Sequence, residues 1–281
     1  MFDIIKQIYL NSIFYDKKIS PKVIYELQYK PSSYLLSSIV KIKAKKFNIN
    51  NFLYDNFWID EKLDQKQLNK LNNFYWLFSL DLKSSNKSVQ KVIKNWIEKN
   101  YKYNSKNWNF EITSKRIISW LSNTALAYDD GGDQYQKDFN LIIHKQTFHL
   151  INQIDKEKKL NDKIRGTAAI ILVGLSYKNE KNLTTKGLEN LKKIIRHAID
   201  NNGFPKSRNI KSSVFFLKYL ILIREWFKES QSEIPNFINE SIFNLGQSYA
   251  FFWENLKFDP LFNGNNNSNN QEFDTYLKRL G

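Results

Sequence analysis

Apolar side chains recur at helical spacing along most of this chain. In the segment 86–100, for example, Val89, Val92, Ile93, Trp96 and Ile97 all fall on one face of a helix. No pair of segments shows the alternation expected of two paired strands. The pattern therefore predicts consecutive helices joined by short loops, over 63–82, 86–100, 113–128, 135–155, 160–177, 183–200, 212–227 and 234–252.

The predicted fold class is all-α, a curved or closed array of helical hairpins. The segment 160–177 is the most apolar helix, and its Gly166, Ala168, Ala169 and Gly174 would let a neighbour approach closely. Thr113 is the expected N-cap of its helix. The chain divides into an N-terminal entry segment (1–60), a helical domain (61–262) and a polar tail (263–281) that we expect to be flexible.

Composition narrows the classes of partner. Among 281 residues, 43 are basic and 28 acidic, so the formal net charge is +15, and aromatic residues make up 15%. Such a charge favours a polyanionic partner, although drift in an A+T-rich genome explains it equally well, because the basic residues are scattered. There is no cysteine, which excludes disulfides and thiol catalysis.

Neither a secretory signal nor a membrane span is evident. The longest apolar run, 168–175, is too short to cross a bilayer, and no cleavage site follows the N-terminal stretch. We expect a cytoplasmic protein, or a periplasmic one if the native N-terminus lies elsewhere. Two of the three histidines, His144 and His149, are five residues apart and lack a carboxylate cluster, so we expect no metal site and no cofactor. The third, His197, would suit the last turn of its helix.

Two groups of residues are candidates for ligand binding. The turn 206–209, between two predicted helices, carries Arg208, a planar donor for a carboxylate, and Asn209, an uncharged donor. Arg116 and Trp120 stand four apart on one helical face and could present a cation beside an indole. Each has a simpler alternative: a solvated loop for the turn, and a core tryptophan with a snorkelling arginine for the pair.

Four motifs occur in an order that resembles the bacterial heparinase II/III-like proteins. The resemblance covers about 63–264 and rests on Phe74–Leu77, Thr113–Ser122, Asn202–Asn209 and Leu261–Gly264. It implies an incomplete (α/α) toroid, followed in the family by an antiparallel β-sandwich. It also implies β-elimination at a uronic acid of an acidic polysaccharide. The sequence ends after the toroid, so a separately encoded β-sandwich is an expected partner.

The resemblance also assigns roles to residues. Arg116 and Trp120 would face the cleft, and Arg208 with the catalytic Asn209 would meet the substrate carboxylate, which takes up charge when the neighbouring proton leaves. Tyr249 is the nearest phenol that could act as the base. One departure stands out: Phe204 occupies a position where relatives commonly have histidine.

Two functions remain open on the sequence. The first is the toroid part of a polysaccharide lyase, either active or retained only for polysaccharide binding. The second is a non-catalytic basic helical scaffold that binds polyanions through its charge. Nucleic-acid binding is less expected, because no known module or basic helix stands out.

Overall fold

Helices account for most of the chain that can be described. The computed structural model describes residues 2–40, 64–80 and 86–256. Within these ranges there is no β-strand, and the isolated β-bridges pair Leu27 with Tyr177 and Ile199 with Pro205. The predicted all-α fold is confirmed.

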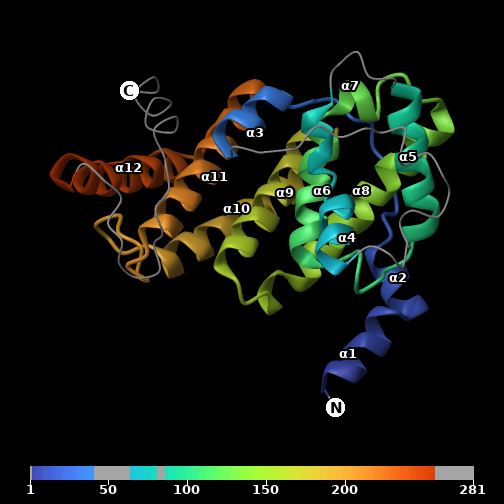
Figure 1. The fold of residues 1–281 in the computed structure, drawn as a ribbon, viewed down its shortest axis with the longest axis horizontal. Helices are drawn as coiled ribbons and strands as arrows, with labels where there is room; N and C mark the ends of the chain where they lie inside the picture. The colour runs from blue at the N-terminus through green and yellow to red at the C-terminus, as the bar shows by residue number, and fades with distance from the viewer. Residues whose placement is uncertain (1, 41–63, 81–85, 257–281) are drawn as a thin grey trace.

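The helices from α5 (Asn86–Asn100) to α12 (Asn236–Leu256) are spread along the long axis of the molecule, with α5 near one end and α12 at the other (Figure 1). Between residues 110 and 198 the loops that join consecutive helices are short, which favours antiparallel neighbours. In chain order the elements are α1 (Phe2–Leu10), α2 (Ile13–Ile19), α3 (Ser33–Val40), α4 (Gln65–Asn72), the 3-10 helix η3 (Tyr75–Ser79), α5 (Asn86–Asn100), α6 (Phe110–Ser122), α7 (Thr124–Ala127), α8 (Asp133–Gln153), the 3-10 helix η4 (Ile154–Lys156), α9 (Leu160–Ser176), α10 (Lys181–Ala198), α11 (Ile210–Glu229) and α12 (Asn236–Leu256).

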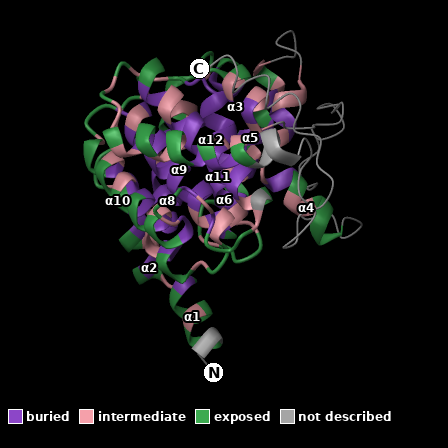
Figure 2. Cartoon of the chain, turned by 90° about the vertical axis from the view of Figure 1, so that its left-hand side faces the viewer, coloured by how far each residue is buried: buried purple, intermediate pink, exposed green. Residues whose placement is uncertain are grey.

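The centre of the core is α9, the helix that the sequence marks as most apolar. It packs against α6, α8, α10 and α11, and nearly every side chain from Ile164 to Gly174 is buried. Figure 2 shows this buried interior enclosed by partly exposed helices. A helix that is apolar all round has to be enclosed in this way, so α9 fixes where its neighbours lie.

Glycines bring α9 and α10 close together. A Cβ added to Gly174 of α9 would lie 2.4 Å from the backbone nitrogen of Thr184 in α10, and one added to Gly187 of α10 would lie 2.5 Å from Cγ1 of Ile171. Neither distance is tolerated between real atoms, so α9 and α10 can cross this closely only because both positions are glycine. The predicted close approach of a neighbour at Gly174 is confirmed.

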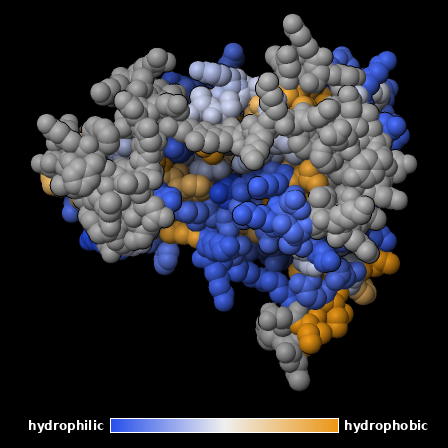
Figure 3. All heavy atoms as spheres, viewed as in Figure 1, coloured by the Kyte–Doolittle hydropathy of each residue, from blue (hydrophilic) through white to orange (hydrophobic). Residues whose placement is uncertain are grey.

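The N-terminal segment joins the same core. Tyr15 of α2 and Leu36 of α3 are buried, α2 packs on α8, and α3 packs on α11. In contrast, α1 projects from the body (Figure 1) and exposes Ile4 and Ile8. Figure 3 shows hydrophobic surface, in orange, on this projecting part of the molecule. None of the helices in the described ranges is both long and apolar enough to cross a bilayer.

The predicted helix over 63–82 is broken in the structure. It ends at Asn72, Phe74 takes a left-handed backbone conformation with φ of 58°, and η3 follows. Phe74 is fully buried, with its ring 5.1 Å from that of Trp120. Packing of this aromatic ring therefore compensates for a conformation that local sequence does not predict.

The prediction that Thr113 caps a helix is wrong. The cap is Asn109, whose side chain accepts a hydrogen bond from the amide of Glu111, whereas Thr113 already donates its amide to the Asn109 carbonyl. The same helix ends at Ser122 instead of 128, because the Asn123 side chain donates to the Ser119 carbonyl and the chain leaves helical geometry there.

The close crossing of α9 and α10 predicts the effect of a single methyl group. Gly174→Ala should lower the free energy of unfolding by about 1 to 3 kcal/mol, because backbone atoms of α10 would have to move. Gly246→Ala is the matched control within helix α12, where an added Cβ meets nothing within 4 Å. It should leave stability unchanged or raise it by up to about 1 kcal/mol. Urea denaturation of both variants tests this, and equal effects would contradict the packing argument.

Candidate functional site

The turn between α10 and α11 is ordered by Asp200. One carboxylate oxygen of Asp200 accepts hydrogen bonds from the backbone amides of Asn202 (3.0 Å) and Phe204 (2.9 Å). Loss of hydration opposes the charged form, but these amides and the Arg208 guanidinium together outweigh it and lower the pKa of Asp200. Gly203 has φ of 80°, a conformation that glycine adopts without strain. The turn is therefore a defined loop and not an unstructured one.

Arg208 is exposed and held in an unusual backbone conformation. Its φ is 57°, in the left-handed region, and its Nη1 donates to the second carboxylate oxygen of Asp200 at 3.0 Å. The side chain remains 59% exposed. Nearby, the Lys206 ammonium donates to the Arg196 carbonyl at the end of α10. Two cations thus lie on the turn, and an ion pair directs one of them.

Asn209 is the N-cap of α11. Its side-chain oxygen accepts a hydrogen bond from the Ser212 amide at 3.3 Å. Because the oxygen is used by the helix, the Nδ2 group is left as the side chain's donor. An anion approaching this turn would meet that donor, the Arg208 guanidinium and the positive end of the α11 dipole.

Helix α12 packs on the same turn. Ser248 donates its hydroxyl to the Gly203 carbonyl at 2.9 Å, and a Cβ on Gly203 would lie 2.3 Å from the Asn244 carbonyl oxygen. Tyr249 follows Ser248 and is 5% exposed. The structure therefore brings the helix of the predicted base beside the turn, with the phenol largely enclosed. The fourth motif of the family resemblance, Leu261–Gly264, lies outside the described residues.

The prediction that Arg116 and Trp120 face a cleft is wrong. Both side chains have 0% exposure. The Arg116 guanidinium lies 4.0 Å from the Trp96 ring centroid and donates to neutral acceptors, among them the carbonyls of Asn72 (2.8 Å) and Asn107 (3.0 Å). Burial lowers the pKa of Arg116 well below its usual value. The alternative of a core tryptophan is the correct one, and the arginine is buried with it.

Sequence reasoning missed a second charged group, around Arg165 of α9. Arg165 donates to a carboxylate oxygen of Asp162 at 2.5 Å and to the Tyr219 hydroxyl at 3.2 Å, and it lies 3.7 Å from Glu111. Burial raises the pKa of Asp162, whereas the cations Lys115 and Arg165 outweigh burial at Glu111 and lower its pKa. The i, i+3 spacing of Asp162 and Arg165 was the only local signal.

The charged group around Arg165 joins three helices and η3. Glu111 belongs to α6, Arg165 to α9 and Tyr219 to α11, and the nearby buried phenol of Tyr75 in η3 has a strongly raised pKa, chiefly through burial. A phenol with a raised pKa keeps its proton and stays uncharged. The arrangement ties the N-terminal ends of α6 and α9 to α11, which is a structural role.

Known structures with the same arrangement of helices include two crystal structures of heparan sulfate lyase HepC from Pedobacter heparinus, one of them a mutant. Both give a TM-score of 0.62 at 11% identity, over 92% and 94% of this chain. A crystal structure of heparinase III gives 0.58 at 14% identity over 95%. The described helices form a heparinase-like toroid. No protein-family model matches the sequence, and no curated protein matches it significantly.

The heparinase-like toroid corresponds to part of those proteins only. This chain spans between 45% and 48% of the length of the matched chains. With identities of 11% to 14%, the likeness establishes the fold and not the chemistry. Function has to be argued from the residues of this chain.

The left-handed backbone of Arg208 makes a prediction about stability. Arg208→Gly should be more stable than Arg208→Ala by about 1 kcal/mol, since both lose the side chain but only glycine adopts this φ without strain. The matched pair Lys206→Gly and Lys206→Ala should show the opposite order, because Lys206 lies outside the positive-φ residues. Thermal unfolding of the four variants checks this; the same order at both positions would contradict it.

Proposed function

We propose that this chain is the toroid part of a polysaccharide lyase-like protein and that the turn from Asp200 to Asn209 binds a carboxylate of an acidic polysaccharide. The observation that carries this proposal is the geometry of the turn. An exposed guanidinium and a helix-capping amide belong to consecutive residues at the start of a long helix, and each side chain is held by its own hydrogen bond, to Asp200 and to the Ser212 amide. Such a group of donors is suited to a planar oxyanion.

The fold likeness supports the class of ligand. The similar structures are named as a heparan sulfate lyase and a heparinase, both named for acidic polysaccharides. The formal net charge of +15 would attract the same kind of polymer, although it does not select one. The turn supplies the selectivity that scattered charge lacks.

The proposed reaction is β-elimination at a uronate. A base removes the proton on the carbon next to the carboxylate, the electron pair forms a carbon–carbon double bond, and the bond to the leaving oxygen breaks and that oxygen takes up a proton. Negative charge develops on the carboxylate oxygens as the proton leaves. Arg208 and the Nδ2 group of Asn209 would stabilise that charge, and Tyr249 is the proposed base.

Arg116 and Trp120 have no part in this proposal as ligand contacts. Both are enclosed in the core, so they act through the packing of α6. A separately encoded β-sandwich that completes the cleft stays a prediction. The proposal concerns the turn, which this chain contains entirely.

Asn209→Ser separates ligand binding from helix capping. Serine is as good an N-cap as asparagine but has no amide donor, so we expect unchanged stability and uronate-polymer binding weakened by about tenfold. Arg208→Ala should weaken binding at least as much. Lys91→Ala, an exposed lysine on α5 at the other end of the molecule (Figure 1), is the charge-matched control and should bind normally. Isothermal titration calorimetry with a polyuronate measures all three.

Catalysis is tested by the ultraviolet absorbance of the unsaturated product. Tyr249→Phe should keep binding and abolish the absorbance if the chain is an active lyase. The alternative, a basic scaffold, predicts no absorbance, equal losses for Lys91→Ala and Arg208→Ala, and an affinity that falls steeply with salt for every polyanion. That combination would overturn the proposed site.

A further inference from the structure

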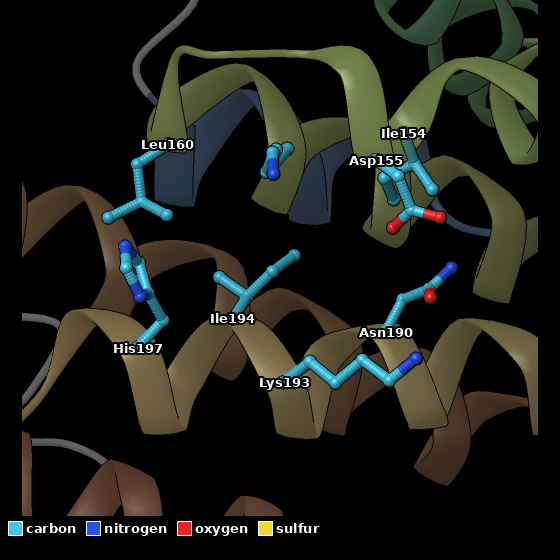
Figure 4. Close-up of a pocket in the computed structure, with 8 residues that line it drawn as sticks. Ile154, Asp155, Leu160, Asn190, Lys193, Ile194 and His197 are labelled. Atoms are coloured by element: carbon cyan, nitrogen blue, oxygen red, sulfur yellow. The ribbon is translucent and has the colours of Figure 1, made fainter.

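A separate pocket lies beside the turn, between η4, the start of α9 and the second half of α10. Its volume is about 190 Å³, smaller than the clefts that usually hold drug-sized ligands. Figure 4 shows Asn190, Ile194 and His197 extending from α10 toward Ile154, Asp155 and Leu160, while the side chain of Lys193 runs along α10 beside Asn190. Lys163 of α9 completes the lining. A compact group, such as one sugar ring, fits this volume.

Asn190 is a buried donor without an acceptor. The residue is 5% exposed, and its Nδ2 has no hydrogen-bond partner in the part of the chain that the structure describes. Buried amide donors are nearly always paired, because an unpaired one loses its hydration without compensation. The side chain points into the pocket (Figure 4), so an acceptor oxygen of a ligand would satisfy it.

The charged and apolar residues that line the pocket indicate which kind of ligand it suits. Lys163 and Lys193 supply two positive charges, and no ion pair involves either of them among the described residues. Asp155 is the single acidic residue of the lining and can accept hydrogen bonds from ligand hydroxyls. Ile154, Leu160 and Ile194 give the pocket an apolar wall. This combination fits a ligand with one anionic group, several hydroxyls and an apolar face.

We propose that the pocket binds one anionic sugar residue, with its carboxylate or sulfate at Lys163, Lys193 and the Asn190 amide and its hydroxyls toward Asp155. This is a second binding site, separate from the turn. It depends on the proposed function only in the choice of an acidic polysaccharide as the source of the sugar. The two sites share the end of α10: His197 lines the pocket, while the carbonyl of Arg196 accepts from Lys206 of the turn.

The test is a titration of the full chain with a glucuronate-containing disaccharide, followed by nuclear magnetic resonance of the Asn190 side-chain amide. Asn190→Leu assigns that signal by its disappearance. We expect the signal to shift on binding, and Lys163→Met or Lys193→Met to weaken the affinity by about tenfold. Lys181→Met, an exposed lysine on the same helix outside the lining, is the control and should bind normally.

Two further titrations show whether the pocket recognises the sugar, its anionic group, or both. A neutral disaccharide should leave the Asn190 signal unchanged, and inorganic sulfate should bind at least tenfold more weakly than the acidic disaccharide. Equal affinity for sulfate would overturn the sugar assignment, and an unmoved Asn190 signal would overturn the site. In Arg208→Ala the Asn190 signal should shift over the same range of disaccharide concentration, because Arg208 does not line the pocket, whereas binding at the turn is lost. Failure of the pocket and failure of the turn therefore give different results.

Discussion

The burial of α9 is the constraint on which the rest of the structure depends. A helix that is apolar on all sides is stable only when enclosed, and here four helices enclose it. Gly174 and Gly187 let α10 lie against it at backbone distance. Because α10 is held so closely, the position of its C-terminal end is fixed. Both the turn and the pocket are built on that end.

Asp200 then converts the fixed end of α10 into a shaped loop. Its carboxylate accepts two backbone amides and the Arg208 guanidinium, so one side chain sets both the path of the chain and the direction of the cation. The positive φ of Arg208 shows that this arrangement is locally strained. A loop selected for stability alone would place glycine there. In the proposed function this strained residue is the one that contacts the carboxylate.

The sequence was sufficient to predict most of the helices after residue 86 and the presence of the turn, because both depend on local patterns. Helical periodicity gives the residues that share a face, but it placed the start of this helix at residue 212, so the capping role of Asn209 was not predicted. It does not say which face is enclosed, and for that reason Arg116 and Trp120 were placed in a cleft and lie in the core. The break at Phe74 had no local signal either, since a non-local aromatic contact compensates for it.

The pocket shows why net charge is a weak guide to where this protein would bind an anion. Asn190, Lys193 and His197 stand at helical spacing on α10, which the sequence displays openly, yet the same is true of many exposed faces in a chain with 43 basic residues. This face differs from the others because η4 and the start of α9 lie across from it. They help to bury the Asn190 amide and give it no acceptor. The Asn190 amide marks this face more sharply than its lysines do, because bulk solvent satisfies exposed cations, whereas this amide lines a pocket, has lost most of its hydration and has no acceptor among the described residues.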